Sequence, residues 1–158
     1  MAKAREIPGL RADLPFALAA RRSVAVRAAE VFEHQRGVLD TEAIKGVHAM
    51  RVATRRLRAI LEMYRACFPP DELRPVLRDV KALADALGAR RDPDVELLAL
   101  EQFMAGVGPD ERAGLELLVT RARSEQAAAN LALAAALEAL LADDLAGRLR
   151  ALAGEGDA

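Results

Sequence analysis

The sequence has little of the material from which disulfide-bonded, metal-bound or all-β domains are built. Its 158 residues include one cysteine, Cys67, no tryptophan, one tyrosine and four phenylalanines. A single cysteine excludes an intrachain disulfide framework and a cysteine-based zinc site, and it is typical of a reducing compartment. Aromatic residues make up only 3% of the chain, which disfavours a β-sandwich because such folds need β-branched and aromatic side chains.

Long apolar runs are missing as well. No uninterrupted apolar stretch approaches the roughly 18 residues of a membrane span, and charges at Lys3, Arg5 and Glu6 lie where a signal peptide has an apolar core. We therefore expect a cytoplasmic protein without a membrane partner. The length fits one domain over residues 1–158, with frayed ends at about 1–9 and 154–158.

Apolar residues, many of them Ala and Leu, make up 53% of the chain. They recur at helix spacing along almost the whole sequence, without strand-like alternation. We predict an all-α fold, an antiparallel helical bundle of about four to six helices. The expected helices span residues 10–37, 41–67, 71–88 and 93–105, followed by either one helix over 110–153 or two helices joined near Asp143 and Asp144.

Four of these boundaries follow from local signals. Thr41 is a plausible N-cap, and Pro69 and Pro70 end the helix that it starts. Gly88 reads as a C-cap. Asp92 followed by Pro93 has the order of an N-cap and a first helical residue.

Positive charge is concentrated in one part of the chain. The net charge is only -1. Residues 45–91, however, contain eleven Lys and Arg against five Asp and Glu, a net charge of +6, and the other 111 residues carry -7. This distribution indicates a localised anion site.

Three of these arginines and one histidine share one side of the expected helix over 41–67. At about 100° per residue, they fall within a sector of about 80° and nearly opposite the apolar residues; this basic stripe consists of His48, Arg51, Arg55 and Arg58. Arg56 lies off to the side. We expect no acidic residue within the stripe to relieve the repulsion between its charges.

The following helix adds Arg74, Arg78 and Lys81 at the spacing i, i+4, i+7. If the two helices are antiparallel neighbours, their basic rows converge on one groove. Guanidinium groups bind phosphate oxygens in pairs and keep their charge, while an imidazole adds a donor that strengthens as the pH falls. Such a row suits a linear array of phosphates.

Other functions stay open on these residues alone. His48 followed by Arg51 also resembles the reactive site of a histidine phosphotransfer bundle, and the stripe could contact a nucleic-acid backbone. The scarcity of aromatic side chains for base stacking makes nucleic acid an unlikely partner. A phosphate-binding loop, a nucleophile triad and paired metal-ligand motifs are absent from the sequence, so we expect no metal, no cofactor and no enzymatic activity.

Two segments together resemble the CHAD family of α-helical domains. Residues 48–58, HAMRVATRRLR, are similar to its His-x-x-Arg-Val-x-x-Arg-Arg-Leu-Arg signature, and residues 87–95, LGARRDPDV, are similar to its Leu-Gly-x-x-Arg-Asp-x-Asp-Val element. The resemblance implies a basic cavity that binds inorganic polyphosphate, often on polyphosphate-containing granules. The positions that match the motifs are His48, Arg51, Arg55, Arg56, Arg58, Arg91 and Asp92, whereas Arg74, Arg78 and Lys81 correspond only loosely. Of these, Asp92 is expected to orient Arg91 or to cap a helix.

The chain departs from the family in one respect. Family members commonly contain two such bundles related by a pseudo-twofold axis, and this sequence resembles the first half only. No second His-x-x-Arg element follows Val95. We therefore expect a homodimer in which symmetry supplies the missing half.

Overall fold

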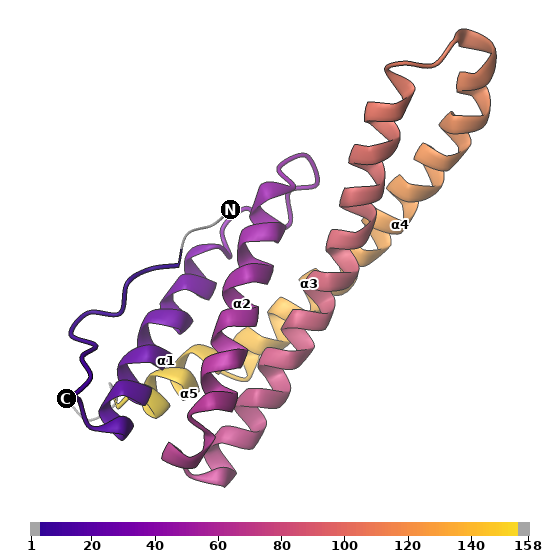
Figure 1. Ribbon diagram of the computed structural model, residues 1–158. Coiled ribbons are helices and arrows are strands. Elements are labelled where there is room, and N and C mark those ends of the chain that lie inside the picture. Colours follow the sequence, from indigo (N-terminus) through magenta and orange to yellow (C-terminus); the bar gives the residue numbers. More distant parts are fainter. Residues whose placement is uncertain (1–3, 155–158) are drawn as a thin grey trace.

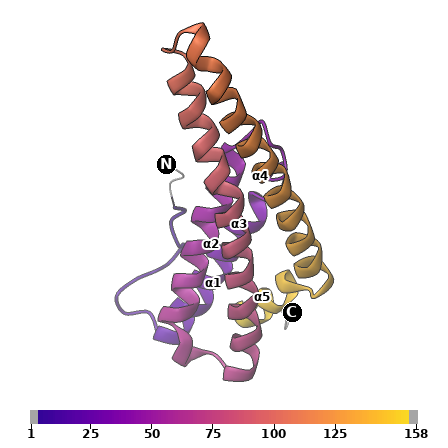
Figure 2. The same ribbon diagram turned by 90° about the vertical axis from the view of Figure 1, so that its right-hand side faces the viewer.

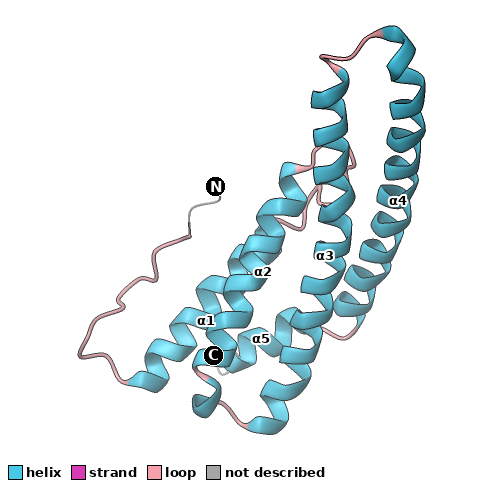
Figure 3. Ribbon diagram, turned by 45° about the vertical axis from the view of Figure 1, so that its right-hand side comes forward, coloured by secondary structure: helices cyan, strands magenta, loops and turns pink. Residues whose placement is uncertain are grey.

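The computed structural model describes residues 4–154, which form five α-helices and one short 3-10 turn (Figure 1). No strand occurs within these residues (Figure 3), so the all-α prediction is confirmed. The helices are α1 (Phe16–Glu33), α2 (Lys45–Met63), α3 (Pro70–Met104), α4 (Pro109–Ala142) and α5 (Leu145–Ala153), and the turn η1 covers Arg65–Cys67.

The helices α1, α2 and α3 run alternately up and down as neighbours, as predicted for an antiparallel bundle (Figure 1). Helix α5 packs mainly against α1 and also contacts α3. Helices α3 and α4 are much longer than the others and continue together beyond them as a two-helix arm (Figure 2). The shorter helices α1, α2 and α5 therefore lie only beside the N-terminal half of α3.

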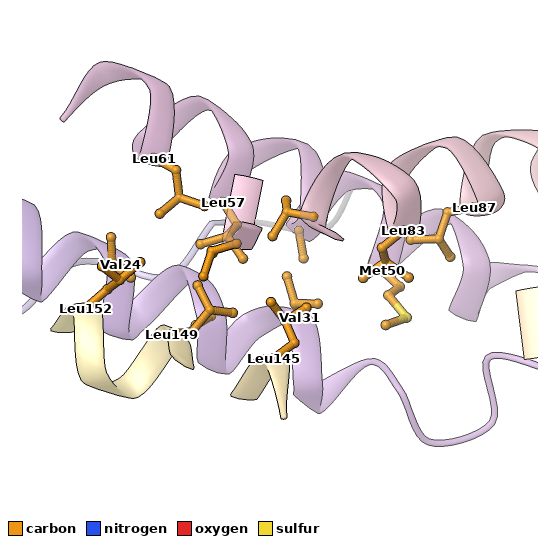
Figure 4. Close-up of a cluster of buried hydrophobic side chains, with 14 of the residues drawn as sticks. Val24, Val31, Met50, Leu57, Leu61, Leu83, Leu87, Leu145, Leu149 and Leu152 are labelled. Atoms are coloured by element: carbon orange, nitrogen blue, oxygen red, sulfur yellow. The ribbon is translucent and has the colours of Figure 1, made fainter. Parts of the chain in front are cut away.

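The hydrophobic core lies where α1, α2, α3 and α5 meet. Figure 4 shows side chains from all four helices pointing into it: Val24, Val31, Met50, Leu57, Leu61, Leu83, Leu87, Leu145, Leu149 and Leu152. Each of these is at most 4% exposed. The apolar side of α2 is therefore fixed against the core, which directs its opposite side outward.

Helix α1 is shorter than predicted because Pro15 precedes it and Gly9, at φ 69°, turns the chain before it. Residues 5–9, expected to be frayed, hydrogen bond to α1. The Arg22 side chain donates to the Gly9 carbonyl at 2.9 Å, and the Arg27 side chain donates to the Arg5 carbonyl at 2.8 Å. Residues 1–3 and 155–158 lie outside the described residues.

Helix α2 begins at Lys45, four residues later than expected, and Thr41 is not its N-cap. The Asp40 carboxylate accepts hydrogen bonds from the backbone of Glu42 and Ala43, at 2.9 and 3.3 Å, and so forms a turn there. At its other end, α2 stops at Met63 and η1 leads into the two prolines, close to the predicted boundary.

The prediction of two helices over 71–88 and 93–105 is wrong. Helix α3 runs unbroken through Gly88, Asp92 and Pro93, so Gly88 is not a C-cap and Asp92 is not an N-cap. Pro93 removes one backbone hydrogen bond, but side-chain contacts span it: Arg90 forms a buried ion pair with Asp94, one helical turn further on. Tertiary contacts therefore outweigh the local signal for a break.

The region 110–153 contains two helices, one of the two alternatives left open. Helix α4 ends at Ala142, and Asp144 adopts a left-handed conformation with φ 47°. Its carboxylate then accepts a hydrogen bond from the backbone of Gly147 at 3.0 Å, which caps α5. None of the helices within residues 4–154 is long and apolar enough to cross a membrane.

Candidate functional site

The basic stripe lies on the outer side of α2. His48, Arg51 and Arg58 are half-buried and Arg55 is exposed, whereas the opposite side of the helix fills the core. The sequence therefore predicts this side correctly from periodicity alone. Helix α3 packs beside α2, so residues of α3 can complete a basic surface along the boundary between the two helices. We use the name basic groove for this boundary, where the sequence predicts a groove.

The structure brings the two motif segments together at one end of the basic groove. The pKa of His48 is lowered, first by its partial burial, then by the positive charge of Arg91 on α3, and further by Arg51 and Arg55 on α2. These four side chains thus form one cluster of positive potential, built from residues 43 positions apart. This positive potential stabilises a bound anion and destabilises the protonated form of His48.

Arg58 carries the stripe one turn further, but it has an acidic partner. Its Nε donates to Glu62 Oε1 at 2.8 Å. This hydrogen bond and the charge of Glu62 raise the pKa of Arg58, and Asp85 on α3 adds to the effect. The expectation that no acid lies within the stripe is therefore wrong. The spacing i, i+4 between Arg58 and Glu62 could have revealed the pair.

Beyond Glu62 the basic groove opens into a cleft of about 600 Å³ between the end of α2 and the start of α3. Arg74, one of the predicted residues, lines this cleft together with Glu62 and Arg65. Arg65 was not predicted as a site residue, although it follows Arg58 by seven positions, about two helical turns.

Lys81 and Arg78, the predicted residues of α3 that follow Arg74, differ in their contacts. Lys81 is exposed and follows Arg74 by seven positions, which puts both on the same side of α3. Arg78 instead donates to Asp79 at 3.0 Å. Asp79 also accepts from Arg148 of α5 at 2.6 Å, so Arg78 is engaged at the junction with α5.

Arg56 lies apart from the basic stripe. Burial tends to raise the pKa of Glu30 on α1, but hydrogen bonds from the Arg5 backbone and the Arg27 side chain lower it overall, and the charges of Arg27 and Arg56 contribute. Arg56 is thus close to Glu30 on the α1 side of α2. The structure separates it from the residues around His48, as its helical angle indicated.

A buried polar network supports the end of the basic groove near Arg91. Arg90 and Asp94 are an ion pair without solvent exposure. Arg90 Nε donates to Asn130 Oδ1 at 3.0 Å, and Gln126 donates to Asp94 Oδ1 at 2.8 Å.

The same network reaches the segment before α2, because Asn130 also donates to the Leu39 carbonyl at 3.0 Å. Sequence analysis missed the structural role of Arg90 and Asp94, since their partners on α4 are 32 to 40 residues away. Asp92, by contrast, is exposed in the middle of α3.

The family comparison agrees with the two motif segments. The model of the CHAD domain family matches residues 22–158, a range that includes α2, α3 and the whole basic groove. No curated protein and no solved structure matches the chain.

Proposed function

The chain belongs to the CHAD domain family, which is associated with polyphosphate binding, and we propose that it binds inorganic polyphosphate in the basic groove without catalysing a reaction. The observation that carries this proposal is the cluster of His48, Arg51 and Arg55 with Arg91, because two separate helices direct positive charge at the same place. Positive charge gathered in this way lowers the cost of binding an anion.

The length of the basic stripe favours a linear polyanion over a single phosphate. Ten residues separate His48 from Arg58, a distance of about 15 Å along α2. Guanidinium groups spaced along that distance can each bind phosphate oxygens in pairs. A chain of phosphates can contact all of them at once, whereas one phosphate can contact only a few.

The charge distribution supports a contact of this kind. Residues 45–91 carry +6 in a chain whose net charge is -1, so the attraction is confined to one surface. By analogy with nucleic acids, each phosphate contacted should steepen the dependence of log affinity on log salt by about 0.7 to 0.9.

Calorimetric titration with polyphosphate of defined length tests the proposal. We expect R51A and R55A each to weaken binding by about 1 to 3 kcal/mol, because each removes charge-assisted hydrogen bonds. R112A, near the far end of the arm, is the control and should bind like the wild type. Unchanged affinity in folded R51A and R55A would exclude this groove as the binding site.

Competition distinguishes the two alternative functions. Polyphosphate should displace DNA from the protein far more readily than DNA displaces polyphosphate. The opposite result would favour a nucleic-acid partner. Transfer of a phosphoryl group to His48 in an assay at neutral pH would favour histidine phosphotransfer.

The proposal extends to assembly and location. Two copies associate so that symmetry supplies a second basic groove, and exposed leucines of α4 support this: Leu117 and Leu131, two residues on a similar side of the helix, are each 73% exposed. The site of action is the cytoplasm, including granules that contain polyphosphate; the single unpaired cysteine, Cys67, is consistent with that compartment.

A further inference from the structure

Two acidic side chains act on Arg58 in the basic groove: Asp85 on α3 acts through its charge, and Glu62 also bonds to it. Glu62 accepts a hydrogen bond from Arg58 Nε at 2.8 Å on one side. On its other side it lines the cleft that also holds Arg65 and Arg74. Glu62 therefore separates the cluster around His48 and Arg91 from a second group of arginines at the far end of the groove.

The ion pair between Arg58 and Glu62 is of a kind that opens easily. The side chains are 41% and 52% exposed, and exposed pairs at this spacing contribute little because water screens them and their side chains must be ordered. A polyphosphate chain offers Arg58 several negatively charged oxygens in place of one carboxylate. The bound polyanion can thus replace Glu62 at Arg58, but it then lies next to a like charge.

We infer that Glu62 is an internal anion that competes with polyphosphate for Arg58, and that the binding groove continues past it to Arg65 and Arg74. This inference rests on the proposed function. From His48 to Arg65 the groove extends over 17 residues, about 25 Å. A short anion can bind beside His48 and Arg91 without disturbing Glu62, whereas a long chain must pass it. Glu62 then weakens the binding of long chains more than that of short ones.

The test compares E62Q with E125Q. Glu125 on α4 accepts from Arg121 Nε at the same 2.8 Å and the same i, i+4 spacing, so both substitutions remove one acid from an equivalent exposed pair. With long-chain polyphosphate in calorimetry, we expect E62Q to bind about two- to fivefold more tightly than the wild type and E125Q to bind as the wild type does. With tripolyphosphate, E62Q should bind as the wild type does.

R65A adds an independent measurement at the far end of the groove. It should weaken binding of long-chain polyphosphate by about three- to tenfold, with melting temperature and circular dichroism unchanged. If E62Q equals E125Q, or R65A binds long chains as the wild type does, the inference is wrong. The proposed function still stands in that case if R51A binds weakly. A wild-type chain that binds neither length of polyphosphate would overturn both.

Discussion

At the scale of single residues, His48 is the group whose charge depends most on what surrounds it. Partial burial and the charges of Arg91, Arg51 and Arg55 lower its pKa, so its imidazole is protonated less readily than that of a free histidine. If polyphosphate binds there as proposed, its charge counters the neighbouring positive charges and raises the pKa of His48 again. We then expect binding to be coupled to proton uptake by His48, and to become tighter at lower pH.

We predict that the affinity for polyphosphate increases as the pH is lowered from 8 to 6, and that this increase is smaller in H48Q. Calorimetric titrations at several pH values measure it. The natural control is H34Q, because His34 at the C-terminal end of α1 is the only other histidine. An equal pH dependence in the wild type and H48Q would deny the imidazole a charged role.

The lowered pKa of His48 also predicts that the protein without polyphosphate becomes less stable as the pH falls, although its affinity for polyphosphate increases. A histidine whose pKa is lowered in the folded state binds fewer protons there than in the unfolded chain, whose histidine pKa is about 6.5. The free energy of unfolding therefore decreases as the pH falls through that value. Melting temperatures at pH 7.5 and 5.5 should show a smaller decrease for H48Q than for the wild type.

The sequence is sufficient to place most residues of the basic stripe. Helical periodicity alone assigns His48, Arg51, Arg55 and Arg58 to the side of α2 opposite the core. It cannot show that Arg148 of α5 donates to Asp79, the residue that also accepts from Arg78, because that contact depends on where a distant helix docks. The pair of Arg58 and Glu62 is a different case. Its i, i+4 spacing is visible in the sequence, and only the effect of Glu62 on the basic stripe was not predicted.

At the scale of the helices, α3 shows where local signals mislead. Gly88, Asp92 and Pro93 together indicate a helix end, yet the helix is continuous. The buried pair of Arg90 and Asp94 bridges the proline. Its hydrogen-bond partners come from α4, so no property of residues 87–95 alone could predict the outcome.

We predict that D94A lowers the free energy of unfolding by about 3 to 5 kcal/mol, because it leaves the buried guanidinium of Arg90 without its counter-charge. Urea denaturation measures this change. E125A, which removes the acid of an exposed pair on α4, should alter stability far less. A D94A variant as stable as E125A would show that the buried network does not hold α3 against α4.

At the scale of the whole molecule, α4 packs along α3 but leaves some of its leucines, Leu117 and Leu131 among them, exposed. Residues 127–142 contain only one charged residue, Glu138, and a helix that is apolar on most sides is usually covered. The fold class was predictable because helix periodicity extends along the whole chain. The length of the arm was not predictable, because it depends on α3 continuing through residues 88–93, where the sequence indicates a break.

This surface gives the dimer proposal its test. Light scattering at micromolar concentration should report a dimer, with or without polyphosphate, and L117E with L131E should shift it towards the monomer. L10E, which changes an exposed leucine before α1, is the matched control. A monomeric wild type under both conditions would contradict the proposal.

Helix α5 has only nine residues, yet it supplies Leu145, Leu149 and Leu152 to the centre of the core. These side chains are the last of the core to leave the ribosome. Helix α5 contacts α1 and α3, the two neighbours of α2, so the core on the apolar side of α2 is complete only when α5 has docked.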